Sequence, residues 1–108
     1  MRVAFCTFRL GGRDGVSVEA AKWQRAFAEL GWDVTTVAGS GTADWIIPGL
    51  ALDAAAPPDR IDVEDALAGS DLVVVDNLLS LPLNPPATAM VADVLRGRPA
   101  LLRHHDLV

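Results

Sequence analysis

The sequence predicts an α/β fold of the Rossmann-like, doubly wound kind, in which helices cover both faces of a parallel sheet. Short apolar runs alternate with helical patterns along the whole chain, in the order β-α-β-(β)-α-β-α-β. The apolar runs show no clean alternation of polar and apolar side chains, which is typical of strands buried on both faces. Because crossovers between parallel strands are right-handed, we expect the strand order 3-2-1-4-5.

The composition indicates one folded domain at most. The chain has 108 residues, of which 51% are hydrophobic and 21% charged, and its net charge is -5. These values argue against disorder, and the acidic balance argues against a nucleic-acid partner. The single cysteine, Cys6, excludes an internal disulfide and is expected to be a buried, unreactive thiol. Without a signal peptide or an apolar run of about 18 residues, a cytoplasmic protein with no transmembrane segment is expected.

The first part of the chain is predicted to be a strand, a helix and a second strand. The first strand spans residues 2–7, and a loop with three glycines follows over residues 8–15. The helix ends at Gly31, which suits the position after a helix, and the second strand spans residues 32–37. One apolar stripe at helical spacing is expected to face the core. It consists of Val16, Ala20, Trp23, Phe27 and Leu30.

The rest of the chain continues the alternation of strands and helices. Pro48 and Gly49 interrupt one apolar run, which is therefore a broken or edge strand, and Pro86 suits the first turn of a helix. In chain order we expect a small-residue loop over 38–44, the broken strand over 45–52, a surface connection over 54–60, a short helix over 63–68, the clearest strand over 71–76, a proline-rich loop over 77–86, a helix over 87–96 and a last strand over 99–105.

The glycine loop between the first strand and its helix is the first candidate site. Gly12 and Gly15 would let phosphate groups approach the backbone amides at the start of the helix, with Arg13 and Asp14 beside them. The structural alternative is a tight turn that needs positive φ angles. A dinucleotide fingerprint fits poorly, because Leu10 stands where its first glycine is required and no acidic residue directly follows the second strand.

Two further loops are expected at the same edge of the sheet, since the carboxyl ends of parallel strands meet there. Asn77 and Asn84 flank the proline-rich loop, which is either a structural turn or a contact to an acceptor molecule. His104, His105 and Asp106 stand where the last strand ends, and neighbouring residues of a strand point to opposite faces. Only one of these histidines is therefore expected to face a cleft, and two histidines without a cysteine make a poor metal site.

Three motifs carry a resemblance to a known family. They are residues 14–20 (Asp-Gly-Val-Ser-Val-Glu-Ala), residues 30–34 (Leu-Gly-Trp-Asp-Val) and residues 105–107 (His-Asp-Leu). In this order and spacing they resemble the N-terminal domain of a GT-B glycosyltransferase, and the chain is similar to the retaining glycosyltransferases of family 4, often called group 1. The resemblance spans essentially all of the sequence.

The resemblance implies that the chain is a partial, acceptor-side Rossmann-like domain whose C-terminal donor domain is absent. Such enzymes transfer a sugar from a nucleotide-diphosphate sugar with retention and without an essential metal. The resemblance places the donor diphosphate near Gly12 or Gly15, Gly15 being the better match, and a donor-sugar contact at His105. His104 departs from the apolar residue or threonine usual in the family, so the resemblance assigns it no role. The 108-residue chain alone is not expected to turn over substrate.

Two other classes remain open at this point. One is a non-catalytic, anion-binding half-domain that acts by assembling with another chain, and the other is a fragment of a nicotinamide enzyme. The last strand is apolar and is followed by no covering helix in the sequence, so we also expect self-association through its edge.

Overall fold

The fold is one parallel sheet with helices on both faces. The computed structural model describes residues 1–10, 15–76 and 84–103. In chain order the elements are β1 (Arg2–Leu10), α1 (Gly15–Glu29), β2 (Asp33–Gly41), β3 (Trp45–Ile46), a 3-10 turn η1 (Pro48–Leu50), α2 (Arg60–Leu67), β4 (Leu72–Asp76), α3 (Pro85–Val94) and β5 (Ala100–Arg103). Within the described residues, five strands pair in parallel in the order β3-β2-β1-β4-β5. The predicted fold class and strand order are confirmed.

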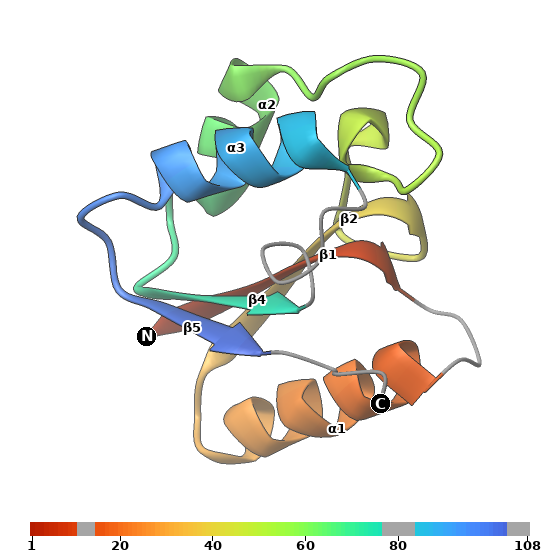
Figure 1. Ribbon diagram of the computed structural model, residues 1–108. Helices are drawn as coiled ribbons and strands as arrows, with labels where there is room; N and C mark the ends of the chain where they lie inside the picture. The colour runs from red at the N-terminus through yellow and green to blue at the C-terminus, as the bar shows by residue number, and fades with distance from the viewer. Residues whose placement is uncertain (11–14, 77–83, 104–108) are drawn as a thin grey trace.

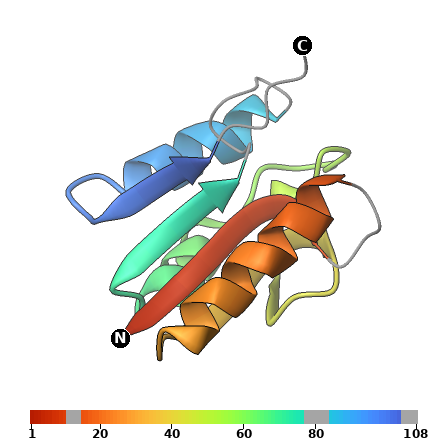
Figure 2. The same ribbon diagram turned by 90° about the horizontal axis from the view of Figure 1, so that it is seen from below.

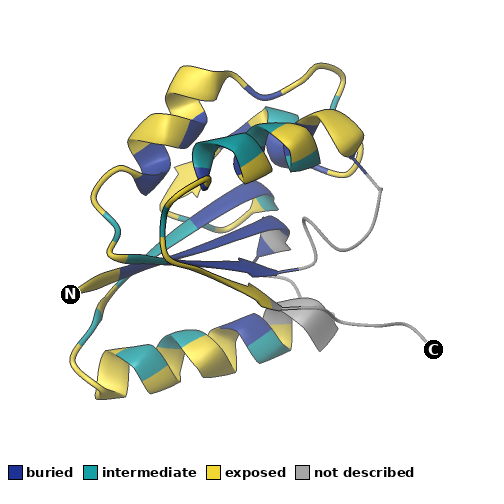
Figure 3. Cartoon of the chain, turned by 60° about the vertical axis from the view of Figure 1, so that its left-hand side comes forward, coloured by how far each residue is buried: buried dark blue, intermediate teal, exposed yellow. Residues whose placement is uncertain are grey.

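The two faces of the sheet are covered unequally. Helix α1 lies alone on one face, and α2 and α3 lie together on the other (Figure 1). The larger core cluster fills the space between the sheet and the α2–α3 layer, where the buried parts of the strands appear dark in Figure 3. Its fully buried members include Ala4, Cys6, Val63, Leu67, Val73, Val75 and Val91. An ion pair between Arg60 on α2 and Asp93 on α3 links the two helices of this layer.

A smaller cluster lies under α1. Phe5 and Val74 are buried there and pack against Phe27 and Trp32. The Phe27 ring meets Phe5 edge to face at a centroid distance of 5.8 Å and meets Trp32 in the same way at 5.3 Å. Aromatic rings attract each other in this arrangement because the positive edge of one faces the negative face of the other. Three aromatic side chains thus hold α1 on the sheet.

The predicted core stripe of α1 is partly wrong. Ala20 is fully buried and Phe27 half-buried, but Trp23 is 38% exposed and Leu30 76% exposed. The helix packs on the sheet through Ala20 and Phe27, which belong to two core clusters. The side chain of Val16, the first member of the predicted stripe, lies outside the described residues. The sequence pattern located the helix and two of its core residues correctly, but it wrongly placed Trp23 and Leu30 in the core.

The ends of two strands also differ from the prediction. The first strand continues to Leu10, which is buried. The second continues to Gly41, through residues that were expected to form a loop. Gly39 explains this extension, because a β-carbon there would lie 2.0 Å from the backbone nitrogen of Ala51. Small residues let the end of β2 pass directly beneath the turn that follows η1.

Helices α2 and α3 both begin earlier than predicted, and each begins at a polar cap. The Asp59 carboxylate accepts a hydrogen bond from the backbone of Ile61 at 3.1 Å. The Asn84 side chain accepts one from the backbone of Ala87 at 3.3 Å. Such caps satisfy backbone donors that have no partner within the first turn of a helix. In the part of the chain that the structure describes, no helix has the length and apolar character needed to cross a bilayer.

Candidate functional site

The carboxyl edge of the sheet is the candidate site. The chain leaves the central strand β1 towards β2 and β3, then returns to the other side of β1 with β4 and β5. The direction of winding therefore reverses between β1 and β4, and in open α/β sheets ligands bind beside such a reversal. Figure 2 shows that β1, β4 and β5 run in the same direction, so their carboxyl ends share one edge.

Thr7 and Asp76 occupy this reversal point. Thr7 lies three residues before the end of β1 and Asp76 ends the neighbouring strand β4, and the hydroxyl of Thr7 donates a hydrogen bond to the backbone oxygen of Asp76 at 3.0 Å. Both residues are almost completely buried, at 2% and 1% exposed. A hydrogen bond between buried groups fixes the relative position of the two strands. The floor of the candidate site is therefore rigid.

Cys6 lies one residue before Thr7 and is buried, as predicted. Burial and, to a smaller extent, the nearby carboxylate of Asp76 together raise the pKa of the Cys6 thiol from 9.0 to about 12. Both effects disfavour the thiolate, which is the nucleophilic form of cysteine. Cys6 is thus a packing residue of the core at neutral pH.

This pKa predicts how stability depends on alkaline pH. Above pH 9.0 the thiol ionises in the unfolded chain, while the native thiol stays protonated up to about pH 12. The free energy of unfolding should therefore fall in this interval, by up to about 1.4 kcal/mol per pH unit. Urea denaturation between pH 8 and 11 measures the fall, and Cys6→Ala should lack this component. Parallel pH profiles for the two proteins would contradict the prediction.

Gly15 is the first residue of α1, which begins beyond the carboxyl end of β1. The free backbone amides at the start of the helix and the positive end of its dipole favour an anion there. The other predicted residues of the glycine loop, Gly12, Arg13 and Asp14, lie outside the described residues.

Asn84 is described, and its side chain makes internal hydrogen bonds. Besides capping α3, its amide nitrogen donates to the backbone oxygens of Gly49 at 3.1 Å and Ala51 at 2.6 Å. The side chain thus joins the start of α3 to the turn after β3. Both amide hydrogens of Asn84 are engaged, and 8% of the residue is exposed. Asn84 therefore has a structural role at the start of α3. The contact of Asn84 with an acceptor molecule stays a prediction.

The remaining predicted site residues fall outside the described ranges. They are Asn77, His104, His105 and Asp106. The strands that precede them end side by side, since Asp76 of β4 pairs with Arg103 of β5. The structure therefore brings together the points from which the two segments leave the sheet.

Sequence reasoning did not assign a role to Thr7, and it noted Asp76 only as the end of a strand. Both carry the same signal, a polar residue that closes an otherwise apolar run. Each of the two strands has such a residue, and the structure places them next to each other. Their adjacency depends on strand order, so the individual runs do not reveal it.

Comparisons with protein-family models, with curated proteins and with solved structures return no match.

Proposed function

We propose that the chain is the acceptor-side domain of a retaining glycosyltransferase that uses a nucleotide-diphosphate sugar. The observation that carries the proposal is the start of α1 at Gly15, beyond the end of the central strand and at the edge where β4 and β5 also end. This arrangement suits a diphosphate at the helix start and a sugar between it and the segment after β5. The His-Asp-Leu motif at residues 105–107 follows β5 directly in the sequence.

Each residue has a defined task in this proposal. As the bond to the sugar breaks, negative charge grows on the leaving diphosphate, and the amides at the start of α1 stabilise it. Gly15 has no side chain and so leaves the diphosphate free to approach. His105 donates a hydrogen bond to a hydroxyl of the donor sugar and orients it for attack. The nucleotide pocket and most of the donor site belong to a second domain.

The test uses the complete open reading frame and a panel of nucleotide sugars. Release of nucleoside diphosphate is measured with and without acceptor mixtures, because slow hydrolysis of the donor reports on the site before the acceptor is known. Gly15→Val and His105→Ala are each expected to lower the rate roughly 10²–10³-fold, the loss typical of one donor to a transition-state charge. His104→Ala is the matched control and should lower it much less, since the sequence predicts a strand up to residue 105 and neighbouring residues of a strand face opposite ways.

Two outcomes would overturn the proposal or part of it. Equal rates for His105→Ala and the unchanged enzyme would remove His105 from the site. Full-affinity binding of a nucleotide sugar to the 108-residue chain alone would contradict the division of the site between two domains.

A non-catalytic half-domain that assembles with another chain is the second candidate. The observation that favours it is strand β5, which ends the order of the described sheet and leaves Leu101 and Leu102 39% and 45% exposed. Binding of nucleoside diphosphate without any turnover, in complex with a second chain, would support this candidate over the transferase. The predicted self-association through β5 belongs to the same question and stays a prediction.

A further inference from the structure

A pocket lies on the α1 face of the sheet, between α1 and the carboxyl ends of β1 and β2. The connection from β2 to β3 consists of residues 42–44 and contains no helix. Parallel strands are usually joined by a dozen or more residues that form a helix on one face of the sheet. Here that position beside α1 is not filled by a crossover helix, and a pocket of about 570 Å³ occupies the space. This volume lies within the range of small-molecule sites.

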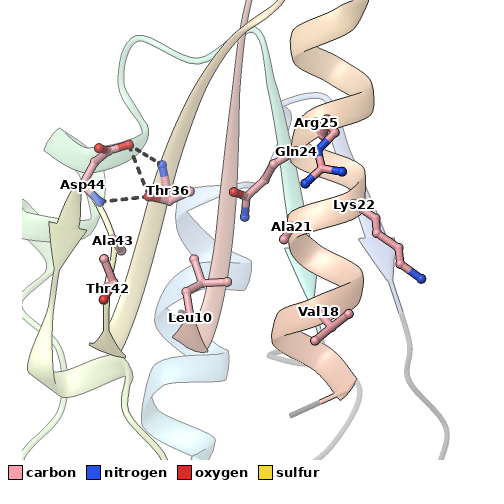
Figure 4. A pocket seen from close by; sticks show the side chains of 10 residues that line it. All are labelled: Leu10, Val18, Ala21, Lys22, Gln24, Arg25, Thr36, Thr42, Ala43 and Asp44. Atoms are coloured by element: carbon pink, nitrogen blue, oxygen red, sulfur yellow. Dashed lines mark hydrogen bonds between the residues drawn. The ribbon is translucent and has the colours of Figure 1, made fainter. Parts of the chain in front are cut away.

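The pocket has a polar end and an apolar end. In Figure 4, Asp44 and Thr36 on one wall and Gln24 and Arg25 on the other lie along one end of the pocket. Leu10, Val18 and Ala43 lie towards the opposite end, together with the hydroxyl-bearing Thr42. A ligand that fits must therefore combine a polar head with an apolar tail.

Asp44 is held in a fixed position. Its Oδ2 accepts hydrogen bonds from the backbone nitrogen of Thr36 at 3.0 Å and from the Thr36 hydroxyl at 3.2 Å. Its own backbone nitrogen donates to the same hydroxyl at 2.9 Å. Among the described residues, the second carboxylate oxygen of Asp44 has no hydrogen-bond partner. The Asp44 carboxylate is thus a fixed negative charge on this wall of the pocket.

Arg25 supplies the opposite charge on the facing wall. The ion pairs found in the described part of the chain involve Lys22, Arg60 and Arg96, and none involves Arg25. A guanidinium binds a carboxylate through two parallel hydrogen bonds. Lys22 also lines the pocket, but it differs from Arg25 because it pairs with Glu19 at 3.4 Å.

We propose that this pocket binds a small zwitterionic ligand with an apolar tail, the chemistry of an apolar α-amino acid. The ligand's carboxylate meets Arg25, its ammonium group meets Asp44, and its tail lies over Leu10, Val18 and Ala43. Opposite charges on facing walls favour a ligand whose polar end carries both a positive and a negative group. Burial of the ligand's apolar tail at the other end of the pocket stabilises the complex. The site shares neither Gly15 nor His105 with the proposed transferase site, so either proposal can fail without the other.

The test is titration of the ¹⁵N-labelled chain with L-leucine as the probe. Amide signals of residues that line the pocket should shift together and saturate in the millimolar range, since both charged groups are exposed to water. L-leucinamide lacks the carboxylate charge and N-acetyl-L-leucine lacks the ammonium group. Each should bind about tenfold or more weakly, the loss expected for one charge-assisted hydrogen bond. Absence of saturable shifts, or equal binding of all three compounds, would overturn the proposal.

Variants of the chain test which wall of the pocket binds each charged group of the ligand. Arg25→Gln should bind L-leucine and L-leucinamide equally weakly, and Asp44→Asn should no longer distinguish L-leucine from N-acetyl-L-leucine. Arg96→Gln removes the same charge as Arg25→Gln at an exposed position that does not line the pocket, and it should leave binding unchanged. Thermal unfolding of each variant shows whether the fold is kept. Equal loss of binding in Arg96→Gln and Arg25→Gln would overturn the proposal, because only a general effect of net charge would remain.

Discussion

Phe5→Ala is expected to lower the free energy of unfolding by about 3–5 kcal/mol. Phe5 lies on the central strand, is 1% exposed and belongs to the cluster that holds α1 on the sheet. Removing its ring takes away apolar contacts and leaves a cavity that the surrounding sheet cannot fill by collapsing. The edge-to-face contact with Phe27 is lost as well.

Urea denaturation followed by far-UV circular dichroism measures this effect. Leu30→Ala is the matched control, because Leu30 lies just after the same helix with 76% of its surface exposed, and it should change stability by about 0.5 kcal/mol or less. The double variant with Phe27→Ala should show a coupling of about 0.5–1.5 kcal/mol between the two rings. A loss at Phe5 as small as that at Leu30 would mean that α1 is not anchored through this cluster.

Gly41→Ala is expected to destabilise the fold by about 2–5 kcal/mol, from backbone strain and overpacking together. Gly41 has a φ angle of +89°, and a β-carbon there would lie 1.8 Å from the backbone oxygen of Leu10. That oxygen also accepts a hydrogen bond from the nitrogen of Thr42 at 3.0 Å. The substitution would therefore push apart the ends of β1 and β2, next to the start of the glycine loop.

Gly31→Ala separates the two causes. Gly31 has nearly the same φ angle, +91°, but no atom lies within 4 Å of a β-carbon built there. Its substitution should show the strain alone, about 1–2 kcal/mol. Thermal and urea unfolding of both variants give the comparison. If both substitutions lower the free energy of unfolding equally, the contact between the new β-carbon at position 41 and Leu10 must relax without cost.

The strand order was predictable because it follows from the alternation of elements and from the handedness of crossovers. The end of β2 was not, since Ala38, Gly39 and Ser40 have the composition of a loop. Their place in the sheet is set by the turn after η1, which packs so closely on Gly39 that only a small residue fits. A tertiary contact with a segment ten or more residues away thus overrides local preference.

The sequence was sufficient to predict at which edge of the sheet the candidate site lies. Gly15 begins α1 after β1, as the glycine loop indicated, and the strands before the other predicted residues end beside each other. Asn84 shows where sequence reasoning is insufficient. An asparagine before two prolines fits a helix cap and a ligand contact equally well, and only its bonds to Gly49 and Ala51 reveal the structural task.

The central position of β1 has a consequence for folding during synthesis. Strand β1 is made first, yet it pairs with β4 as well as with β2, and Thr7 and Asp76 are separated by 69 positions in the chain. At ribosomal rates of about 5–20 residues per second, roughly 4–14 s pass between the synthesis of these two residues. Throughout this interval one edge of an apolar strand has no partner in the nascent chain. We expect chaperones to bind nascent chains up to this length and to release them once β4 has left the ribosome.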